Sequence, residues 1–345
     1  MHKLSDILFI ALCTLLTGGE DFEDMVAFGE ERFDWLATKL ALPNGIPSHD
    51  TFNRVLQMID PEQLKEALAA DGAALIEHVE EQLVVLDGKK LRGASARGPA
   101  GTGLYILHAW VSEVNLCIGQ RKVGDKSNEI TAIPALLDEL SLKGAIVSID
   151  AIGCQKNIAD QIVAKEADYI LALKGNQEEL LEEVHESFQF SGLDQTDEDW
   201  EYGHGRFEKR HCATLRASDC LSPNMQQAWP SIKTLVKIEA TRMVGEATST
   251  QTRYYISTLT QRTAQDMNRL IRSHWSVENQ LHWHLDVTFA EDANRARSGH
   301  APENLSILRK LALHRIAMDD SRLSKRKRRY KAAMNLDYLE KVLRL

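Results

Sequence analysis

The sequence lacks an apolar run long enough to cross a membrane. The longest run, Ile7 to Leu16, has ten residues, half of the ~20 that a bilayer-spanning helix needs. We also expect no secretory signal, because Asp6 lies where a basic segment is required and residues 17–20 offer no small-residue cleavage site. We therefore expect no membrane partner and a cytoplasmic location.

Cysteine and proline are scarce as well. The five cysteines are odd in number and never spaced Cys-x-x-Cys, so neither a disulfide framework nor a cysteine zinc site is indicated. Eight prolines and 20 glycines, with 43% hydrophobic and 26% charged residues, exclude collagen-like, disordered and low-complexity classes. The 345 residues predict a globular protein with one large, interrupted domain or two to three modules.

Positive charge is outweighed by negative charge. The chain has 41 Lys and Arg against 50 Asp and Glu, a net charge of -9, which taken whole argues against a nucleic-acid partner. The distribution is uneven, however: residues 178–202 hold ten carboxylates and no Lys or Arg, whereas residues 321–331 hold seven Lys and Arg and no acid. Such a chain can bind a polyanion on its basic face, although each run is also typical of a solvated helix.

Apolar spacing divides the chain into regions of different secondary structure. Residues 1–82 have helical spacing and predict an all-helical N-terminal module. Strand-like runs follow at 83–88, 105–114 and 115–123, and the order helix, strand, helix, strand at 127–140, 145–150, 155–166 and 168–173 requires parallel neighbours in one sheet. An acidic helix to about residue 190 and a β-rich stretch at 200–259 precede further helices.

Two aspartates at the ends of predicted strands are the first candidates for chemistry. Asp87 and Asp150 each follow apolar residues and precede a nearby glycine, so each carboxylate should emerge at a sheet edge beside a tight turn. Mg²⁺ prefers oxygen ligands and completes its shell with phosphates and water. Asp is common in turns, so one such residue is weak evidence, but two with a later helical glutamate are stronger.

The later glutamate is Glu278. On a predicted continuous helix, His274, Glu278 and His282 share one face because they are spaced i, i+4. The same pattern allows a zinc site on the two histidines, although it lacks the residue order of zinc peptidases. It also allows a buried polar network around Trp275 and Trp283. The segment alone leaves these alternatives open.

Seven separate motifs resemble, in order and spacing, the H-repeat-associated branch of bacterial insertion-sequence transposases. The motifs lie at 87–93, 126–134, 150–155, 173–177, 204–206, 253–257 and 274–283, and the resemblance covers nearly the whole chain. Related branches carry a Tyr, an Arg and a Lys around the catalytic Glu. This sequence departs from that pattern, because the corresponding positions hold Ile271, His274 and Leu285.

The resemblance implies a fold and its divisions. The fold class is α/β, a ribonuclease-H-like mixed sheet with flanking helices and an all-helical N-terminal module at 1–82. The catalytic domain at 83–345 would be interrupted by a β-rich insertion at about 191–260, placed before the last catalytic helix. A basic helical segment at about 321–345 would end the chain.

The resemblance also implies a DDE transposase. On matching positions Asp87, Asp150 and Glu278 are the catalytic carboxylates that bind two Mg²⁺ ions, with Mn²⁺ able to substitute. The expected partner is double-stranded DNA, first at the insertion-sequence ends, where cleavage frees 3′-hydroxyls, and then at the target that those hydroxyls attack. Recombining two ends implies a homo-oligomer, at least a dimer on DNA, in the nucleoid.

Basic residues near the predicted strand ends, in the matching motifs and in the C-terminal run are the predicted DNA contacts. They are Lys89, Lys90, Arg92, Lys174, Arg206, Arg272, His274, Lys325, Arg326, Lys327, Arg328 and Arg329. Trp200 or Trp229 is a candidate for stacking on a base extruded at the cleavage site, although tryptophan more often packs inside proteins.

Two other functions stay open. A metal-dependent nuclease without strand transfer would share the whole site and differ only in its products. A catalytically inactive or domesticated DNA-binding protein is disfavoured, because such a descendant is expected to have lost a carboxylate and all three candidates are present.

Overall fold

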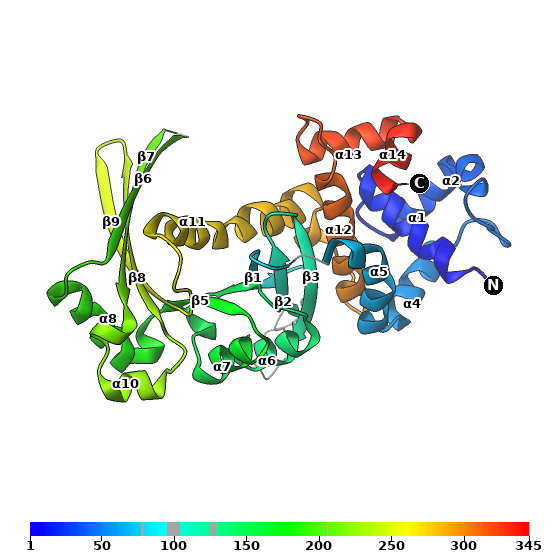
Figure 1. Ribbon diagram of the computed structural model, residues 1–345. Coiled ribbons are helices and arrows are strands. Elements are labelled where there is room, and N and C mark those ends of the chain that lie inside the picture. Colours follow the sequence, from blue (N-terminus) through cyan, green and yellow to red (C-terminus); the bar gives the residue numbers. More distant parts are fainter. Residues whose placement is uncertain (77–78, 95–103, 125–128, 204, 345) are drawn as a thin grey trace, which may run out of the picture.

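A computed structural model describes residues 1–76, 79–94, 104–124, 129–203 and 205–344 (Figure 1). Its first part is helical, as the apolar spacing predicts. Asp21 and Ser48 accept hydrogen bonds from backbone N–H groups at the starts of two of these helices, which fixes where they begin. The helices are α1 (Leu4–Thr17), α2 (Phe22–Glu31), α3 (Phe33–Ala37), α4 (His49–Met58) and α5 (Pro61–Ile76).

A mixed sheet forms the centre of the molecule. Strands β1 (Leu83–Leu91), β2 (Leu104–Val111) and β3 (Leu116–Val123) are antiparallel neighbours, and β4 (Ile146–Ile149) and β5 (Asp168–Leu173) run parallel to β1. The strand order β3-β2-β1-β4-β5 is the ribonuclease-H-like arrangement. The predicted strands and the parallel βαβαβ segment are therefore confirmed.

Both faces of this sheet are buried. Successive residues of a strand point to opposite faces, so Val84 and Leu86 lie in the core beneath α6 (Glu129–Glu139) and α7 (Lys156–Ala164), whereas Leu83 and Val85 face the core that the N- and C-terminal helices share. Burial on both faces explains why β1 and β4 read as continuous apolar runs rather than as alternating ones.

The β-rich insertion continues the same sheet. After α8 (Glu178–Phe190), β9 pairs with β5 in antiparallel orientation and the sheet extends through β8 and β7 to β6. The far halves of these strands project from one end of the molecule (Figure 1). The elements are β6 (Gln195–Gly203), β7 (Arg206–Arg216), α9 (Ala217–Cys220), α10 (Pro223–Ala228), β8 (Thr234–Val244) and β9 (Ala247–Ser257).

The segment around Glu278 is not the regular helix that its spacing predicts. Helix α11 (Ala264–His274) is followed by two π-helical turns, η3 (Glu278–His282) and η4 (His284–Thr288), and by a 3₁₀ turn, η5 (Glu291–Ala293). π-Helical turns are wider than α-helical ones and are frequent at functional sites. The i, i+4 spacing of an α-helix therefore does not apply to the turn between Glu278 and His282.

The two ends of the chain meet in one helical cluster. Helix α1 packs against α12 (Ala301–Ala317), α13 (Lys325–Met334) and α14 (Leu336–Leu343), and Figure 1 shows the blue and red helices together at the end opposite the projecting strands. The helical N-terminal residues and the basic C-terminal residues thus share a core rather than forming separate lobes.

Arg329 ties this cluster together from the inside. Its side chain is 5% exposed, lies over the ring of Phe289, and donates hydrogen bonds to the backbone oxygens of Leu15, Gly19 and Thr288. Arg328 likewise donates to carbonyl groups, those of residues 316, 317 and 321. The prediction that Arg328 and Arg329 contact DNA is corrected, because their guanidinium groups are used within the fold.

We expect Arg329→Met to lower the free energy of unfolding by about 3 kcal/mol, because three backbone acceptors lose a charged donor and each buried unsatisfied group costs ~1–3 kcal/mol. Arg326→Met, at an exposed position on the same helix, should change it by less than about 0.5 kcal/mol. Urea unfolding of both variants measures the difference, and equal effects would contradict the internal role of Arg329.

Candidate active site

The pairing of β1 with β4 brings the first two predicted carboxylates together. Their last parallel partners are Leu86 and Ile149, so Asp87 and Asp150 are the next residues on neighbouring strands. Asp150 follows the end of β4, as predicted, and its Oδ1 accepts a hydrogen bond from the N–H of Ile152. Asp87 lies within β1 rather than at its end, because β1 continues along β2 after β4 has stopped.

Glu278 begins the π-helical turn η3, and its side chain is exposed. The two flanking histidines anchor this helical segment to different strands. Nδ1 of His274 lies 2.9 Å from the hydroxyl of Ser148 on β4, and Nδ1 of His282 lies 3.6 Å from Oδ2 of Asp87 on β1. The segment that carries Glu278 is therefore held across the two strands that carry the aspartates.

The carboxylates repel one another and are not neutralised. Burial, together with the negative charges of Glu129, Asp150 and Glu278, raises the pKa of Asp87 to about 7, although a hydrogen bond from the N–H of Gly88 lowers it. Burial lowers the pKa of both His274 and His282 to about 4, so neither ring carries a charge at neutral pH. In the described part of the chain, neither Lys nor Arg forms an ion pair with the three predicted carboxylates.

This donor set fits a hard divalent cation better than zinc. Carboxylate oxygens without a protein cation are the ligands that Mg²⁺ prefers, with water and phosphate completing its shell. The zinc alternative is not supported, because His274 and His282 contact different strands. Among the described residues, no three His, Cys, Asp or Glu side chains are placed to hold one ion together, so a bound ion would need ligands from solvent or substrate.

A fourth carboxylate, Glu129, was missed by the sequence analysis as a site residue. It is the first residue of α6, accepts a hydrogen bond from the hydroxyl of Tyr105, and acts electrostatically on both Asp87 and Asp150. A Cβ atom at Gly88 would lie 2.4 Å from Oε1 of Glu129, which explains the glycine after Asp87. The motif at 126–134 contained this residue, but nothing in its spacing indicated that α6 would start beside β1.

The predicted DNA contacts near the site divide into two groups. Lys90, Arg92 and Lys174 are exposed, and Arg206 is partly exposed beside Glu208. Lys89, by contrast, is 7% exposed. Its ammonium group pairs with two carboxylates inside the protein, so its prediction as a phosphate contact is corrected.

Two further predicted contacts on α11 are bound to the protein itself. The guanidinium of Arg272 pairs with Asp199 and Glu201 of β6, and His274 is neutral and bound to Ser148. Arg272 therefore joins the insertion to the helix before Glu278. Its charge is already balanced by the acidic stretch that stood out in the sequence.

The tryptophans have different environments. Trp229 is 3% exposed and packs in the core, so it cannot stack on a base. Trp200 on β6 is 61% exposed, and Trp275 and Trp283, which flank Glu278, are 37% and 50% exposed. The interpretation of Trp275 and Trp283 as the centre of a buried network is therefore wrong.

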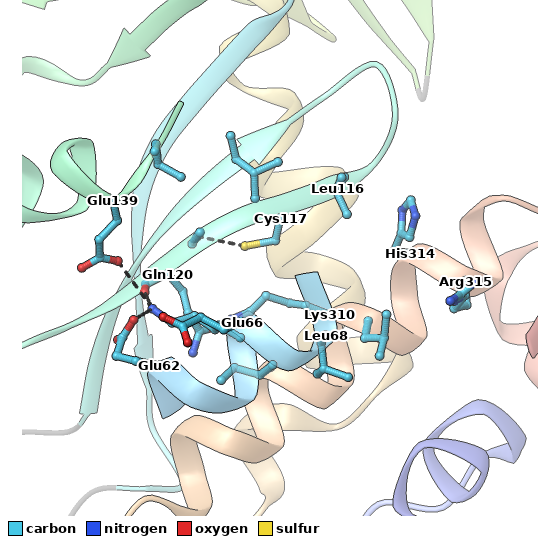
Figure 2. A pocket seen from close by; sticks show the side chains of 16 residues that line it. Glu62, Glu66, Leu68, Leu116, Cys117, Gln120, Glu139, Lys310, His314 and Arg315 are labelled. Carbon is cyan, nitrogen blue, oxygen red and sulfur yellow. Dashed lines mark hydrogen bonds and ion pairs between the residues drawn. The ribbon is translucent and has the colours of Figure 1, made fainter. Parts of the chain in front are cut away.

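A cavity of about 430 Å³ lies away from these carboxylates. It is bounded by α5, β3 and α12, and Figure 2 shows Gln120, Lys310 and His314 among its lining side chains. None of the four site carboxylates lines it.

The described helices include none that is long and apolar enough for a membrane span.

The raised pKa of Asp87 predicts a pH-dependent cost to stability. Between about pH 4 and pH 7 the folded protein keeps a proton that the unfolded chain releases, so stability falls as the pH rises through this window. In EDTA, Asp87→Asn should raise the free energy of unfolding by about 2–4 kcal/mol at pH 8 and by less than half as much at pH 5. Asp160→Asn, at an exposed position of α7, is the control; an equal gain at both pH values would contradict the shift.

Family models and relatives match this chain over most of its length. The family model "Transposase DDE domain" matches residues 79–314, and a model of the region associated with that domain matches residues 1–70. The chain is 36% identical to "Putative transposase YncI" of Escherichia coli O157:H7, over 99% of this chain and 89% of that protein. It is equally identical to "H repeat-associated putative transposase YhhI" of Escherichia coli K12, over 99% and 92%.

Among solved structures, the chain aligns with a piggyBac transposase synaptic complex with hairpin DNA at a TM-score of 0.44 and 12% identity, over 100% of this chain and 74% of that one. A TM-score this low does not establish a shared fold.

The family model covers well over half of the residues, including all four site carboxylates, and the two relatives align along nearly the full chain. The chain belongs to the DDE transposase family.

Proposed function

We propose that this protein is an active transposase that cuts DNA at insertion-sequence ends and joins the freed 3′ ends to target DNA. The observation that carries the proposal is the β1–β4 register, which sets Asp87 beside Asp150, with Glu278 held across both strands. A partly buried carboxylate without a Lys or Arg partner, as Asp87 is among the described residues, lowers stability. A site that receives divalent cations and a phosphate accounts for a carboxylate in this position.

In this proposal Asp87, Asp150 and Glu278 would share Mg²⁺ ions with water and phosphate oxygens, because no three described side chains of this kind surround one ion. When bound, Mg²⁺ supplies a lowered pKa for the attacking water or 3′-hydroxyl and charge stabilisation at the scissile phosphate. The neutral rings of His274 and His282 fix the position of the helical segment without adding charge. Exposed Lys90 and Lys174 would orient the DNA backbone, because cations near the reacting phosphate position the backbone without reading its sequence.

Both reactions would use the same residues. Hydrolysis and strand transfer each replace one oxygen on phosphorus by another, so the chain needs no side-chain nucleophile and forms no covalent intermediate with DNA. Asp87, Asp150 and Glu278 would serve both steps, with water attacking in the first and the 3′-hydroxyl in the second. Bringing two ends together requires at least two copies of the chain on DNA.

A second DNA contact surface is proposed on the outer face of α13 and the loop before it. Arg322, Arg326 and Lys327 are exposed and Lys325 is partly exposed, while Arg328 and Arg329 are turned inward. Tyr330 is 69% exposed on the same helix. Exposed cations on one face of an otherwise acidic protein support binding to a polyanion.

A nuclease without strand transfer is the nearest alternative, since it would use the same carboxylates. The products distinguish the two functions: cleaved ends alone for a nuclease, and cleaved plus joined ends for a transposase. An inactive DNA-binding protein would produce neither. A duplex carrying the native terminal sequence, incubated with a second duplex as target, separates these outcomes.

The metal requirement and Glu278 can be tested together. Mg²⁺ and Mn²⁺ should support cleavage of an end-bearing duplex, whereas Ca²⁺ should allow binding with little cleavage, because its larger and looser shell suits a two-ion site poorly. Glu278→Gln should reduce cleavage at least 1000-fold, roughly 4 kcal/mol in the barrier, with unchanged DNA affinity. Glu186→Gln, at an exposed position of α8, should cleave normally. Normal cleavage by Glu278→Gln would exclude Glu278 as a ligand.

The α13 surface predicts a measurable salt effect. Arg322→Gln, Arg326→Gln and Lys327→Gln combined should weaken DNA binding regardless of sequence and reduce the slope of log affinity against log salt by about 2.7, roughly 0.9 for each lost phosphate contact. Fluorescence anisotropy at several salt concentrations measures the slope. Lys143→Gln, at an exposed cation before β4, is the control, and an unchanged slope in the triple variant would show that this face does not touch DNA.

A further inference from the structure

Lys89 connects the strand of the first carboxylate to the helical segment of the third. Its Nζ lies 2.6 Å from Oδ1 of Asp286 in η4 and 2.8 Å from Oε2 of Glu291 in η5. The side chains of Lys89 and Glu291 are 7% and 1% exposed. Lys89 follows Asp87 by two residues and Asp286 follows Glu278 by eight, so the ion pair bridges the two halves of the site.

The far side of this contact is fixed to the helical core. The second oxygen of Glu291 accepts a hydrogen bond from the hydroxyl of Ser306 on α12 at 2.8 Å. Ser306 is fully buried. Glu291 therefore cannot follow Lys89 if β1 shifts, and the lysine is held between a fixed carboxylate and the one on η4.

The backbones beyond Lys89 are also in close contact. The N–H of Arg92 donates to Asp292 at 3.1 Å, and Nε of Arg297 donates to the carbonyl of Gly93 at 3.0 Å. A Cβ atom at Gly93 would lie 2.1 Å from the carbonyl oxygen of Asn294, so only glycine allows this approach. Residues 89–93 thus pack against residues 286–297.

We propose that Lys89, Asp286 and Glu291 form a brace that sets the spacing between Asp87 and Glu278, with Lys89 and Glu291 buried and Asp286 34% exposed. They are positioning residues, and the proposal rests on the proposed function of those carboxylates. A buried ammonium is stable only while its carboxylate partners stay within hydrogen-bonding distance, so the brace permits one separation of strand and helix. Such control is needed because Glu278 lies on a π-helical turn and has an exposed side chain.

The brace also defines the role of Asp286. Asp286 is a second carboxylate on the helical segment that carries Glu278. Its Oδ1 accepts a hydrogen bond from the ammonium group of Lys89. Asp286 therefore pairs with a lysine, whereas Glu278 pairs with none that the structure describes. Asp286 thus neutralises a lysine, and among the described residues the three predicted ligands have no Lys or Arg partner.

Lys89→Met tests the brace, with Lys122→Met as its control at an exposed position of β3. Lys89→Met should keep metal-free affinity for an end-bearing duplex within twofold. It should lose cleavage at least 100-fold and bind Mn²⁺ at least tenfold more weakly, as measured by electron paramagnetic resonance of the protein–DNA complex. Lys122→Met should leave the Mn²⁺ affinity unchanged. Equal Mn²⁺ affinities of the two variants would overturn the proposal.

A double variant separates positioning from stability. Lys89→Met lowers the melting temperature because it leaves Glu291 charged and buried, whereas Lys89→Met with Glu291→Gln removes that charge and should recover most of the loss. If Lys89 positions the site, Mn²⁺ affinity and cleavage stay low in the double variant although the melting temperature returns. Their recovery together with the melting temperature would show that Lys89 is only structural.

The wild-type protein separates this proposal from the proposed function. A wild type that binds Mn²⁺ but cuts no DNA counts against the transposase activity, while the Mn²⁺ affinities of the variants still decide the brace. A wild type that does not bind Mn²⁺ on DNA overturns both. A wild type that binds and cuts, with a double variant that does the same, overturns the brace alone.

Discussion

Burial of a carboxylate close to other carboxylates is the constraint around which the rest of this structure is arranged. Burial, together with the negative charges of Glu129, Asp150 and Glu278, raises the pKa of Asp87 to about 7, and burial also raises the pKa of Glu129. The chain holds them there by strong backbone pairing of β1 with β2 and β4 and by apolar packing on both faces of the sheet. The stability of the sheet thus offsets the instability of the site.

The helical segment over the site is held from three directions. Arg272 ties its start to the acidic strand β6, His274 and His282 bind β4 and β1, and Lys89 binds its end. The insertion consequently does more than add strands, because β6 extends the central sheet and also neutralises a cation next to the site. Part of the acidic segment 178–202 therefore pairs with cations inside the protein. The cations of the basic segment 321–331 are divided between the core and the surface.

Much of the fold follows from local patterns. The apolar runs of β1, β4 and β5 are strands that are buried on both faces, and such runs are recognisable without tertiary information. Asp87, Asp150 and Glu278 could be selected because two followed apolar strands and all three matched spaced motifs. The family match identifies the kind of domain, and the register of β1 and β4 sets Asp87 beside Asp150.

The sequence by itself determined the order of helices and strands and the positions of the carboxylates along the chain, because both depend on short-range periodicity. Only the tertiary structure decided which charged side chains pair inside the protein and which face solvent. Lys89 and Lys90 are neighbouring residues of the same type. Because side chains alternate along β1, Lys89 is buried against Asp286 and Glu291, whereas Lys90 is exposed. Arg329 and Arg326 differ in the same way on α13. The partners lie between 40 and more than 300 residues away, and no local pattern encodes contacts at that separation.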